Sequence, residues 1–286
     1  MNSYFSTFLC TGVLSTMMIK KKRITAALLA LGLGAVTMFS QFPVSAAEET
    51  AQNTDAAAQT ADPSVVVTNG IDGWPQASDI SSAAAIVMET STNTVLYSKN
   101  ADQPLYPASA VKIMTCLIAL ENSRLDEQVT MTATGVSGVT DGGANISSQL
   151  DEVFTMEQCL YAIMVASAND IALQVAEHVG GSVDAFVQTM NTRAQELGCT
   201  NTVFTNPTGL PDDNQHTTAH DMALIMQAAI QNESFRTIAA ATSYTIPATN
   251  KAAARNLTSK FTMTDTGSTG FYEGCIGGKE GYTEAS

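Results

Sequence analysis

Residues Tyr106 to Glu121 read YPASAVKIMTCLIALE, and this stretch predicts a buried helix. Pro107 stands just outside the predicted start at Ala108, a place where proline is tolerated. The residues that follow are apolar on nearly every face, which is typical of a helix inside a core. One cation, Lys112, interrupts the apolar surface one turn after Ser109. The stretch therefore places an amine where an unpaired charge is costly.

Ser109 and Lys112 could act together as a nucleophile and its base. Burial and the positive field of a helix N-terminus both disfavour an ammonium, so the pattern predicts a lowered pKa for Lys112. A neutral amine could accept the hydroxyl proton of Ser109, which is the minimum for nucleophilic catalysis. The alternative is a partly buried helix whose lysine reaches water along its methylene stem. A pattern of four residues leaves both interpretations open.

The first 46 residues are predicted to be a signal peptide with an upstream extension. Basic residues from Lys20 to Arg23 precede an apolar run from Ile24 to Phe39 and the small-residue sequence from Val44 to Ala47. These are the three regions of a secretory signal. The apolar run has 16 residues, fewer than the ~20 that a membrane-spanning helix needs. We therefore expect an exported, extracytoplasmic protein and regard a retained anchor as the less favoured alternative.

The charge of the chain is strongly negative. Its formal net charge is −14, and residues 1–46 hold four basic and no acidic residues, which leaves −18 on the remainder. A surface of this kind repels nucleic acid and anionic membranes, so neither is an expected partner. Residues 47–70 are predicted to be a disordered acidic, alanine-rich linker. The folded domain is then predicted over residues 71–286.

Hydrophobic patterning predicts an α+β class for that domain. Two strands, Ala83–Glu89 and Thr94–Tyr97, flank a turn in which Asn93 can take a positive φ, a hairpin pattern. Residues 129–150 are rich in Gly, Ser and Thr and predict a loop-rich excursion. Capping residues and periodicity predict helices over 155–165, 170–179, 183–197 and 218–230, and short strands over Tyr244–Pro247 and Phe261–Thr264.

Three polar clusters stand in order along this domain: Ser109–Lys112, Ser167–Asn169 and Lys279–Gly281. The first is the only Ser-x-x-Lys in the chain, and the third is the only Lys-x-Gly. Ser-x-Asn occurs three times, but only Ser167–Asn169 lies at a predicted helix junction. Their order and context make the three clusters more specific together than any one alone.

With these clusters and the segments PASAVK, ASAND, AEHVGGS, ELGCTNT, FTNPTGL and GYTEAS, the chain resembles the D-alanyl-D-alanine carboxypeptidases. These are low-molecular-weight penicillin-binding proteins, whose pattern is Ser-x-x-Lys, Ser-x-Asn and Lys-Thr-Gly. The resemblance covers the chain from about Ser82 to its end. It implies a β-lactamase/transpeptidase-like fold, in which an antiparallel sheet of the hairpin and the Lys-x-Gly strand accompanies a helical subdomain.

The same resemblance implies the chemistry. Substrates would be peptidoglycan stem peptides at the cell wall or the outer face of the cytoplasmic membrane. β-Lactams would be acylating inhibitors, and neither a metal nor a cofactor would be needed. Ser109 would be acylated, Lys112 would be its base, and Ser167 would pass a proton to the leaving D-alanine. The implied substrate-binding residues are Asn169, Lys279, Glu280, Gly281 and Tyr282.

Within that set, each residue has an implied role. Asn169 would hold the substrate amide, while Lys279 would supply positive charge near the substrate carboxylate and lower the pKa of Lys112. The oxyanion hole would use the N–H groups of Ser109 and Tyr282. Water would then hydrolyse the acyl-enzyme.

The chain departs from the family pattern at two places. Glu280 replaces the usual threonine, and two like charges about 4 Å apart repel by roughly 4 kcal/mol at an effective dielectric near 20. Our hypothesis is that Glu280 pairs with a cation or turns aside and that activity survives. The chain also ends at Ser286, where the family continues with two strands and a terminal helix. We therefore expect a C-terminally incomplete catalytic domain without the family's membrane anchor.

Two other functions compete with this one. A class A β-lactamase shares the serine and lysine motifs but needs a glutamate for deacylation, and no Glu-x-x-x-Asn occurs between Asn169 and Lys279. A non-catalytic peptidoglycan-binding homologue, inert or impaired through Glu280 and the missing strands, is the alternative from another class. His216 and His220 are spaced four apart, but without a third ligand no metal site is expected. The cysteines show no C-x-x-C spacing and are interpreted mainly as core residues.

Overall fold

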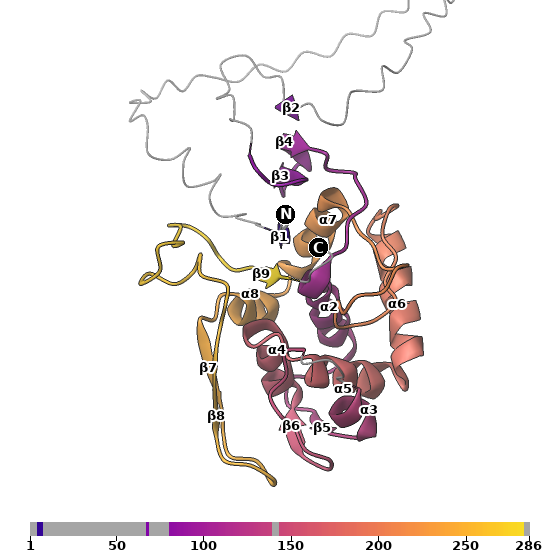
Figure 1. Cartoon of the computed structure of the whole chain (residues 1–286), viewed down its shortest axis with the longest axis vertical. Helices are drawn as coiled ribbons and strands as arrows, with labels where there is room; N and C mark the ends of the chain where they lie inside the picture. Colours follow the sequence, from indigo (N-terminus) through magenta and orange to yellow (C-terminus); the bar gives the residue numbers. More distant parts are fainter. Residues whose placement is uncertain (1–4, 8–66, 69–79, 139–142, 283–286) are drawn as a thin grey trace, which may run out of the picture.

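We describe a computed structural model of the chain over residues 5–7, 67–68, 80–138 and 143–282 (Figure 1). The predicted signal peptide and linker lie almost wholly outside these residues, so their boundaries stay predictions. None of the helices in the described ranges is both long enough and apolar enough to cross a membrane.

The predicted buried helix is the centre of the helical part. A 3₁₀ turn, η1 (Ala108–Val111), leads into helix α2 (Lys112–Asn122), and every residue from Lys112 to Ala119 is buried. Figure 1 shows α2 among the other helices, whose side chains complete the core around it. The helices in contact with it are α4 (Met156–Val165), α5 (Asn169–Gly180), α6 (Val183–Glu196), α7 (Ala219–Ala229) and α8 (Glu233–Ala239).

Capping side chains begin α4, α6 and α7 where the sequence predicts. Gln158 N–H donates to Thr155 Oγ1 at 3.2 Å and Thr155 N–H donates to Gln158 Oε1 at 2.9 Å, which completes the predicted capping box of α4. Ser182 Oγ accepts from Ala185 N–H at the start of α6, and Thr218 Oγ1 accepts from Asp221 N–H at the start of α7. Asn232 caps α8, a seven-residue helix that the sequence patterns did not predict.

The hairpin also forms as predicted. Strands β3 (Ala85–Glu89) and β4 (Thr94–Lys99) pair antiparallel, and Asn93 in their turn has φ +58°. Gln227 of α7 donates from Nε2 to Thr90 O and to Asn93 Oδ1, so the turn is tied to the helical part. The other edge of β4 pairs with the short strand β2 (Val67–Thr68).

Strand β9 (Lys279–Gly281) contains the Lys-x-Gly cluster. In the described part of the chain it pairs with β1 (Phe5–Thr7) and not with the hairpin, so the two form separate sheets. No sequence pattern predicted a strand so near the N-terminus. On its other side β9 contacts η1, which brings the first and third polar clusters together.

The excursion after α2 has more regular structure than predicted. It holds β5 (Gln128–Thr130), α3 (Ala133–Ser137) and β6 (Val153–Thr155), and β5 pairs antiparallel with β6. These strands have three residues each, too few for the alternating pattern to identify them among so many small polar residues.

The last predicted strand, Phe261–Thr264, was wrong. β7 (Ser243–Ile246) pairs instead with β8 (Arg255–Thr258), where Leu257 faces the core between exposed neighbours. Phe261 is buried because its ring packs against the backbone of Gly278, so its apolar character reflects a contact and not a strand.

A buried ion pair fastens this hairpin, which Figure 1 shows extending along one side of the helices. The Glu152 side chain is fully buried, and Arg255 of β8 donates to its two oxygens at 2.7 and 3.0 Å. Thr249 Oγ1 donates to Glu152 Oε1 at 2.6 Å. Farther along, the rings of Tyr161 and Tyr244 stack with centroids 3.8 Å apart.

The cysteines of the helical part are core residues. Cys116, Cys159 and Cys199 are buried, and they carry free thiols, as does the half-buried Cys275. Burial raises the pKa of Cys116 to about 12, so this thiol stays protonated beside the site described next.

Candidate active site

Lys112 is the centre of a buried polar cluster. Its side chain is fully buried, and Nζ lies 3.1 Å from Ser109 Oγ, 2.6 Å from Asn169 Oδ1 and 2.5 Å from Thr208 O. Burial, together with the positive charge of Lys279, holds the pKa of Lys112 well below its usual value. The structure therefore brings the first two sequence clusters into one hydrogen-bonded group.

The three partners of Lys112 differ in what they can do. Asn169 Oδ1 and the Thr208 carbonyl oxygen accept hydrogen bonds and cannot donate them, whereas the Ser109 hydroxyl can do both. A neutral amine has two N–H groups and one lone pair. With the two N–H groups donated to Asn169 and Thr208, the lone pair faces the Ser109 hydroxyl. This arrangement suits Lys112 to accept the Ser109 proton.

Sequence reasoning missed the contribution of Thr208. Its carbonyl is held by the loop FTNPTGL, in which Asn206 Oδ1 accepts from Thr208 N–H at 3.1 Å, Thr208 Oγ1 at 2.8 Å and Gly209 N–H at 2.8 Å. Thr115 Oγ1 of α2 donates to Pro207 O at 2.7 Å, which joins the loop to the helix of Lys112. The Asn-Pro-Thr-Gly sequence indicates a turn, but a main-chain contact to a distant lysine has no side-chain pattern to identify it.

Backbone strain adjoins Ser109, the predicted nucleophile. Ala108, immediately before Ser109, has φ +46°, a conformation that L-residues rarely adopt. The Thr208 loop packs against it so closely that a Cβ at Gly209 would lie 1.8 Å from Ala108 O. Strain of this kind persists only where the surroundings fix it, and it clusters at functional sites.

Ser167 lies at the junction between α4 and α5, as predicted. It has φ +56° and is 7% exposed, and Asn169 two residues later is the first residue of α5. Asp170 holds the adjoining loop, because its carboxylate accepts from Ile146 N–H and from Ser148 N–H and Oγ. The hydrogen bonds of both active-site lysines go to groups other than Ser167, so its proton-relay role stays a prediction.

Lys279 pairs with its own neighbour. Its fully buried Nζ donates to Glu280 O at 2.7 Å and to Glu280 Oε1 at 3.0 Å. Burial lowers the pKa of Lys279, and the negative charge of Glu280 opposes that effect. Glu280 therefore pairs with a cation, as hypothesised. That cation is Lys279, the residue that the family resemblance places near the substrate carboxylate.

Gly281 lies next to Ser109, the predicted nucleophile. A Cβ at this position would lie 2.8 Å from Ser109 N, so only glycine lets β9 approach the first turn of η1 this closely. Tyr282 follows at the end of β9, with about half of its side chain exposed. The expected oxyanion hole between the N–H groups of Ser109 and Tyr282 stays a prediction.

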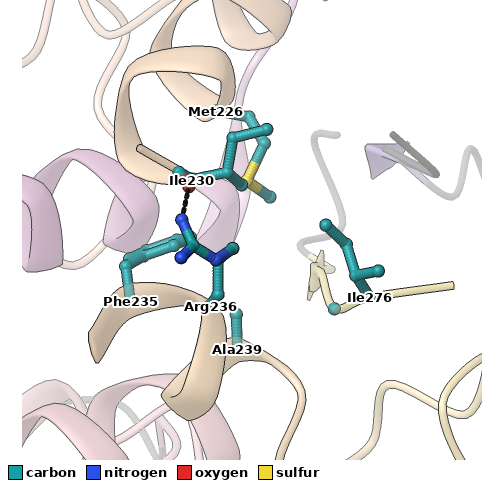
Figure 2. Close-up of a pocket in the computed structure, with 7 residues that line it drawn as sticks. Met226, Ile230, Phe235, Arg236, Ala239 and Ile276 are labelled. Atoms are coloured by element: carbon teal, nitrogen blue, oxygen red, sulfur yellow. Dashed lines mark hydrogen bonds between the residues drawn. The ribbon is translucent and has the colours of Figure 1, made fainter. Parts of the chain in front are cut away.

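Two further features lie apart from the Lys112 cluster: the histidines spaced four apart, and a hollow beside Arg236. His220 Nδ1 lies 3.0 Å from Asp102 Oδ1 and His216 Nδ1 lies 3.0 Å from Asn214 O, and no group of three metal-binding side chains occurs within the described ranges. Figure 2 shows a small hollow whose one charged side chain, Arg236, donates to Ile230 O. The other lining residues are apolar or glycine: Met226, Phe235, Ala239, Ile276 and Gly277.

Comparisons with known proteins agree on one family. A family model described as D-alanyl-D-alanine carboxypeptidase matches residues 72–286. The carboxypeptidase DacF of Bacillus subtilis is 36% identical over 156 residues, which is 53% of this chain and 39% of that protein. A D-alanyl-D-alanine carboxypeptidase of a Streptomyces strain is 30% identical over 214 residues, 71% of this chain and 72% of that protein. The chain thus spans about two fifths of the length of the Bacillus relative.

Solved structures give the same result. The Streptomyces K15 DD-transpeptidase superposes with a TM-score of 0.67 at 27% identity, covering 73% of this chain and 83% of that one. A D-alanyl-D-alanine carboxypeptidase from Mycobacterium tuberculosis superposes with a TM-score of 0.67 at 29% identity, covering 75% of this chain and 78% of that one. The predicted transpeptidase-like α+β fold is confirmed.

Proposed function

The chain belongs to the D-alanyl-D-alanine carboxypeptidase family, and from that premise we propose that it removes the terminal D-alanine of peptidoglycan stem peptides through an acyl-enzyme on Ser109. The observation that carries this proposal is the environment of Lys112. Its amine is fully buried and contacts two groups that can only accept hydrogen bonds, together with the hydroxyl of Ser109. These contacts suit the amine to act as a base toward that hydroxyl.

Acylation would begin with the transfer of the Ser109 hydroxyl proton to Lys112 Nζ. Oγ attacks the carbonyl carbon of the penultimate D-alanine, and the carbonyl oxygen becomes an oxyanion. The close approach of Gly281 to Ser109 N supports a binding place for that oxyanion between η1 and the end of β9. Collapse of the intermediate breaks the peptide bond, and the leaving amine takes a proton through Ser167.

Deacylation would use the same groups in the reverse roles. Water attacks the ester carbonyl carbon, and a proton of that water passes to Lys112. The ester bond then breaks, and Ser109 Oγ takes the proton back from Lys112. Asn169 serves both half-reactions, because its Oδ1 fixes Lys112 while its amide nitrogen can face the substrate. The positive charge of Lys279 supports the reaction by keeping the pKa of Lys112 low.

The impaired or inert alternative is less well supported. A buried lysine that served only stability would gain most from a carboxylate hydrogen-bonded to it, whereas the hydrogen-bond partners of Lys112 are neutral. Burial and the charge of Lys279 lower the pKa of Lys112 more than the charge of Glu280 raises it. The β-lactamase alternative remains disfavoured by the missing glutamate motif. β-Lactams would therefore acylate Ser109, and the resulting acyl-enzyme would be hydrolysed slowly.

The site of action follows from the substrate. Peptidoglycan lies outside the cytoplasmic membrane, so the protein would act there after export by the predicted signal peptide over residues 1–46. The acidic segment 47–70 would then serve as a linker ahead of the catalytic domain.

Labelling with a fluorescent penicillin tests the proposal directly. The chain should form a stable covalent adduct, and release D-alanine from a blocked tripeptide ending in D-Ala-D-Ala. Both activities should be lost in Ser109→Ala, whose circular dichroism spectrum should match that of the parent. A folded parent chain that shows neither activity would exclude the proposed function and favour the inert homologue.

A further inference from the structure

Asp170 is a buried carboxylate that is satisfied by one short segment, residues 144–148. The residue is 3% exposed, and its oxygens accept from Ile146 N–H at 3.3 Å, from Ser148 N–H at 3.2 Å and from Ser148 Oγ at 2.8 Å. Ile171 N–H donates to it at 3.0 Å. No ion pair in the described part of the chain includes Asp170. Because a buried carboxylate is costly without its donors, this charge fixes the segment in place.

The same segment holds the main chain of Asn169. Ala144 O accepts from Asn169 N–H at 2.8 Å, and Asn169 is the first residue of α5. The N–H groups in the first turn of a helix have no partner within the helix, so the segment satisfies one of them. Two adjacent residues, Asn169 and Asp170, therefore bind residues 144–148 to the start of α5.

The chain before Asn169 is held from the side of α4. Ala168 N–H donates to Ala162 O at 3.1 Å, and Ser167 has φ +56°. An L-residue keeps such a conformation only where its surroundings fix it. If the contacts of residues 144–148 were lost, this junction could relax, and Asn169 would move with it.

Asn169 in turn positions the amine of Lys112. Its Oδ1 accepts from Lys112 Nζ at 2.6 Å, and both residues are buried. A shift of about 1 Å at a reacting group can lower a rate by about 100-fold. The printed contacts therefore run without a gap from Asp170 to residues 144–148, then to Asn169 and to Lys112.

We propose that Asp170 is a positioning residue: by holding residues 144–148 against the start of α5, it keeps Asn169 where its amide orients the amine of Lys112. The inference rests on the proposed function, because it takes Lys112 as the base. The hydrogen bonds of Asp170 go to neither Ser109 nor Lys112, so it acts through Asn169 and not on the reacting atoms. Asp170 also lies outside the three polar clusters found in the sequence.

A double-mutant cycle tests this role. The second-order rate constant for acylation by a fluorescent penicillin is measured for the full chain, Asp170→Asn, Asn169→Ala and the double variant. Asp170→Asn keeps the shape but removes the charge, and it should slow acylation of the parent chain by about 10- to 100-fold. In Asn169→Ala no amide remains to be positioned, so the same change should slow acylation by less than about a third of that factor.

Ser148→Ala is a milder variant that removes only the hydrogen bond of 2.8 Å to Asp170. It should slow acylation of the parent chain by about three- to tenfold, and acylation of Asn169→Ala by less than about twofold. Circular dichroism shows whether each variant is folded. If Asp170→Asn does not fold, the cycle of Ser148→Ala with Asn169→Ala decides the question.

Glu177→Gln is the matched control. Glu177 is another carboxylate of α5 that binds a neighbouring segment, since it accepts from the hydroxyls of Thr132 and Thr134. Glu177→Gln should lower the midpoint of denaturant unfolding, while the acylation rate of the folded protein should stay within about twofold of the parent. A loss of stability alone is thus distinguished from a loss of position.

The outcomes separate this inference from the proposed function. Asp170 is not a positioning residue if its folded variant, or Ser148→Ala in its place, leaves the parent rate unchanged or slows acylation equally with and without the Asn169 side chain. An equal loss of rate in Glu177→Gln overturns the inference too. In each of these cases the proposed function stands. A folded parent chain that penicillin does not acylate removes the proposed function, and the inference fails with it.

Discussion

Asn169 Oδ1 accepts a hydrogen bond of 2.6 Å from Lys112 Nζ, a contact that joins the first residue of α5 to the first residue of α2. Because an amide oxygen is neutral, it orients the amine without stabilising its charged form. The contact thus fixes the proposed base, Lys112, in place without favouring its protonated form.

Replacing this amide by a carboxylate should change the pH dependence of the reaction. An opposite charge this close to Nζ raises the pKa of Lys112, by about one to three units. In Asn169→Asp the rise of the penicillin acylation rate with pH should therefore move to higher pH by that amount, with recovery of the rate in alkaline solution. Asn169→Ala is the control, and it should lower the rate without moving the profile upward. A lowered rate with an unshifted profile in Asn169→Asp would contradict the role given to Lys112.

Lys112→Arg should abolish most of the acylation while keeping a positive charge. A guanidinium does not lose its proton in this pH range, so it cannot accept the proton of Ser109. Loss of the base should slow acylation by about 10²- to 10⁴-fold, measured as the second-order rate constant with a fluorescent penicillin. Thermal unfolding of the same sample shows whether the larger side chain is accommodated. A folded variant that retains a rate within about tenfold of the parent would exclude Lys112 as the base.

Gly209→Ala should disrupt the site far more than an equivalent change elsewhere. Gly209 has φ +82°, and its Cβ would lie 1.8 Å from Ala108 O, whereas Gly198 has φ +84° with open space around it. Gly198→Ala should therefore lower the free energy of unfolding by about 1–2 kcal/mol, the cost of the left-handed conformation alone. Gly209→Ala should cost about 3 kcal/mol or more, because the loop must also move.

Denaturant unfolding and penicillin acylation measure the two effects. Acylation should survive in Gly198→Ala and should fall in Gly209→Ala, since the displaced loop carries the Thr208 carbonyl away from Lys112. Equal losses of stability and activity in the two variants would show that the close contact at Ala108 is unimportant.

The pair of Glu152 and Arg255 should make a large and pH-dependent contribution to stability. Arg255→Ala leaves a buried carboxylate without its cation and should lower the free energy of unfolding by about 3–5 kcal/mol at neutral pH. Burial alone would raise the pKa of Glu152, but Arg255, Thr249 and the N–H of Gln149 together hold it below its usual value. A depressed pKa adds stability above the unfolded value, near 4.3, which is lost as the pH falls through the folded value.

Unfolding measured against pH tests that sign. The free energy of unfolding of the parent chain should fall as the pH is lowered. In Glu152→Gln it should fall less, because the glutamine side chain does not titrate. An Arg255→Ala variant with an unchanged unfolding free energy would show that the pair contributes nothing.

Much of the site could be predicted because it depends on local sequence patterns. Helix caps, the buried helix of Lys112 and the order of the three polar clusters are all encoded within short windows. Thr208 could not be predicted, since its role rests on a main-chain oxygen placed by a distant turn. The strand Arg255–Thr258 was missed because one buried residue, Leu257, does not make an alternating pattern, while the more apolar Phe261 suggested a strand of its own.

The partner of Glu280 was also beyond sequence reasoning. Adjacent residues of a strand point to opposite faces, so a pattern-based argument does not pair residues 279 and 280. Lys279 makes the contact because its long side chain bends back to the main-chain oxygen and carboxylate of the next residue. The expectation that Glu280 pairs with a cation is confirmed, and the cation is Lys279; the survival of activity stays a prediction.

The part of β9 that lies beside Ser109, at Gly281, consists of main chain alone. Since Gly281 sets the distance between β9 and Ser109 without any side chain, residue 280 can vary in charge and size while the reacting atoms keep their spacing. Mutation at that single position should therefore leave the spacing between β9 and Ser109 unchanged.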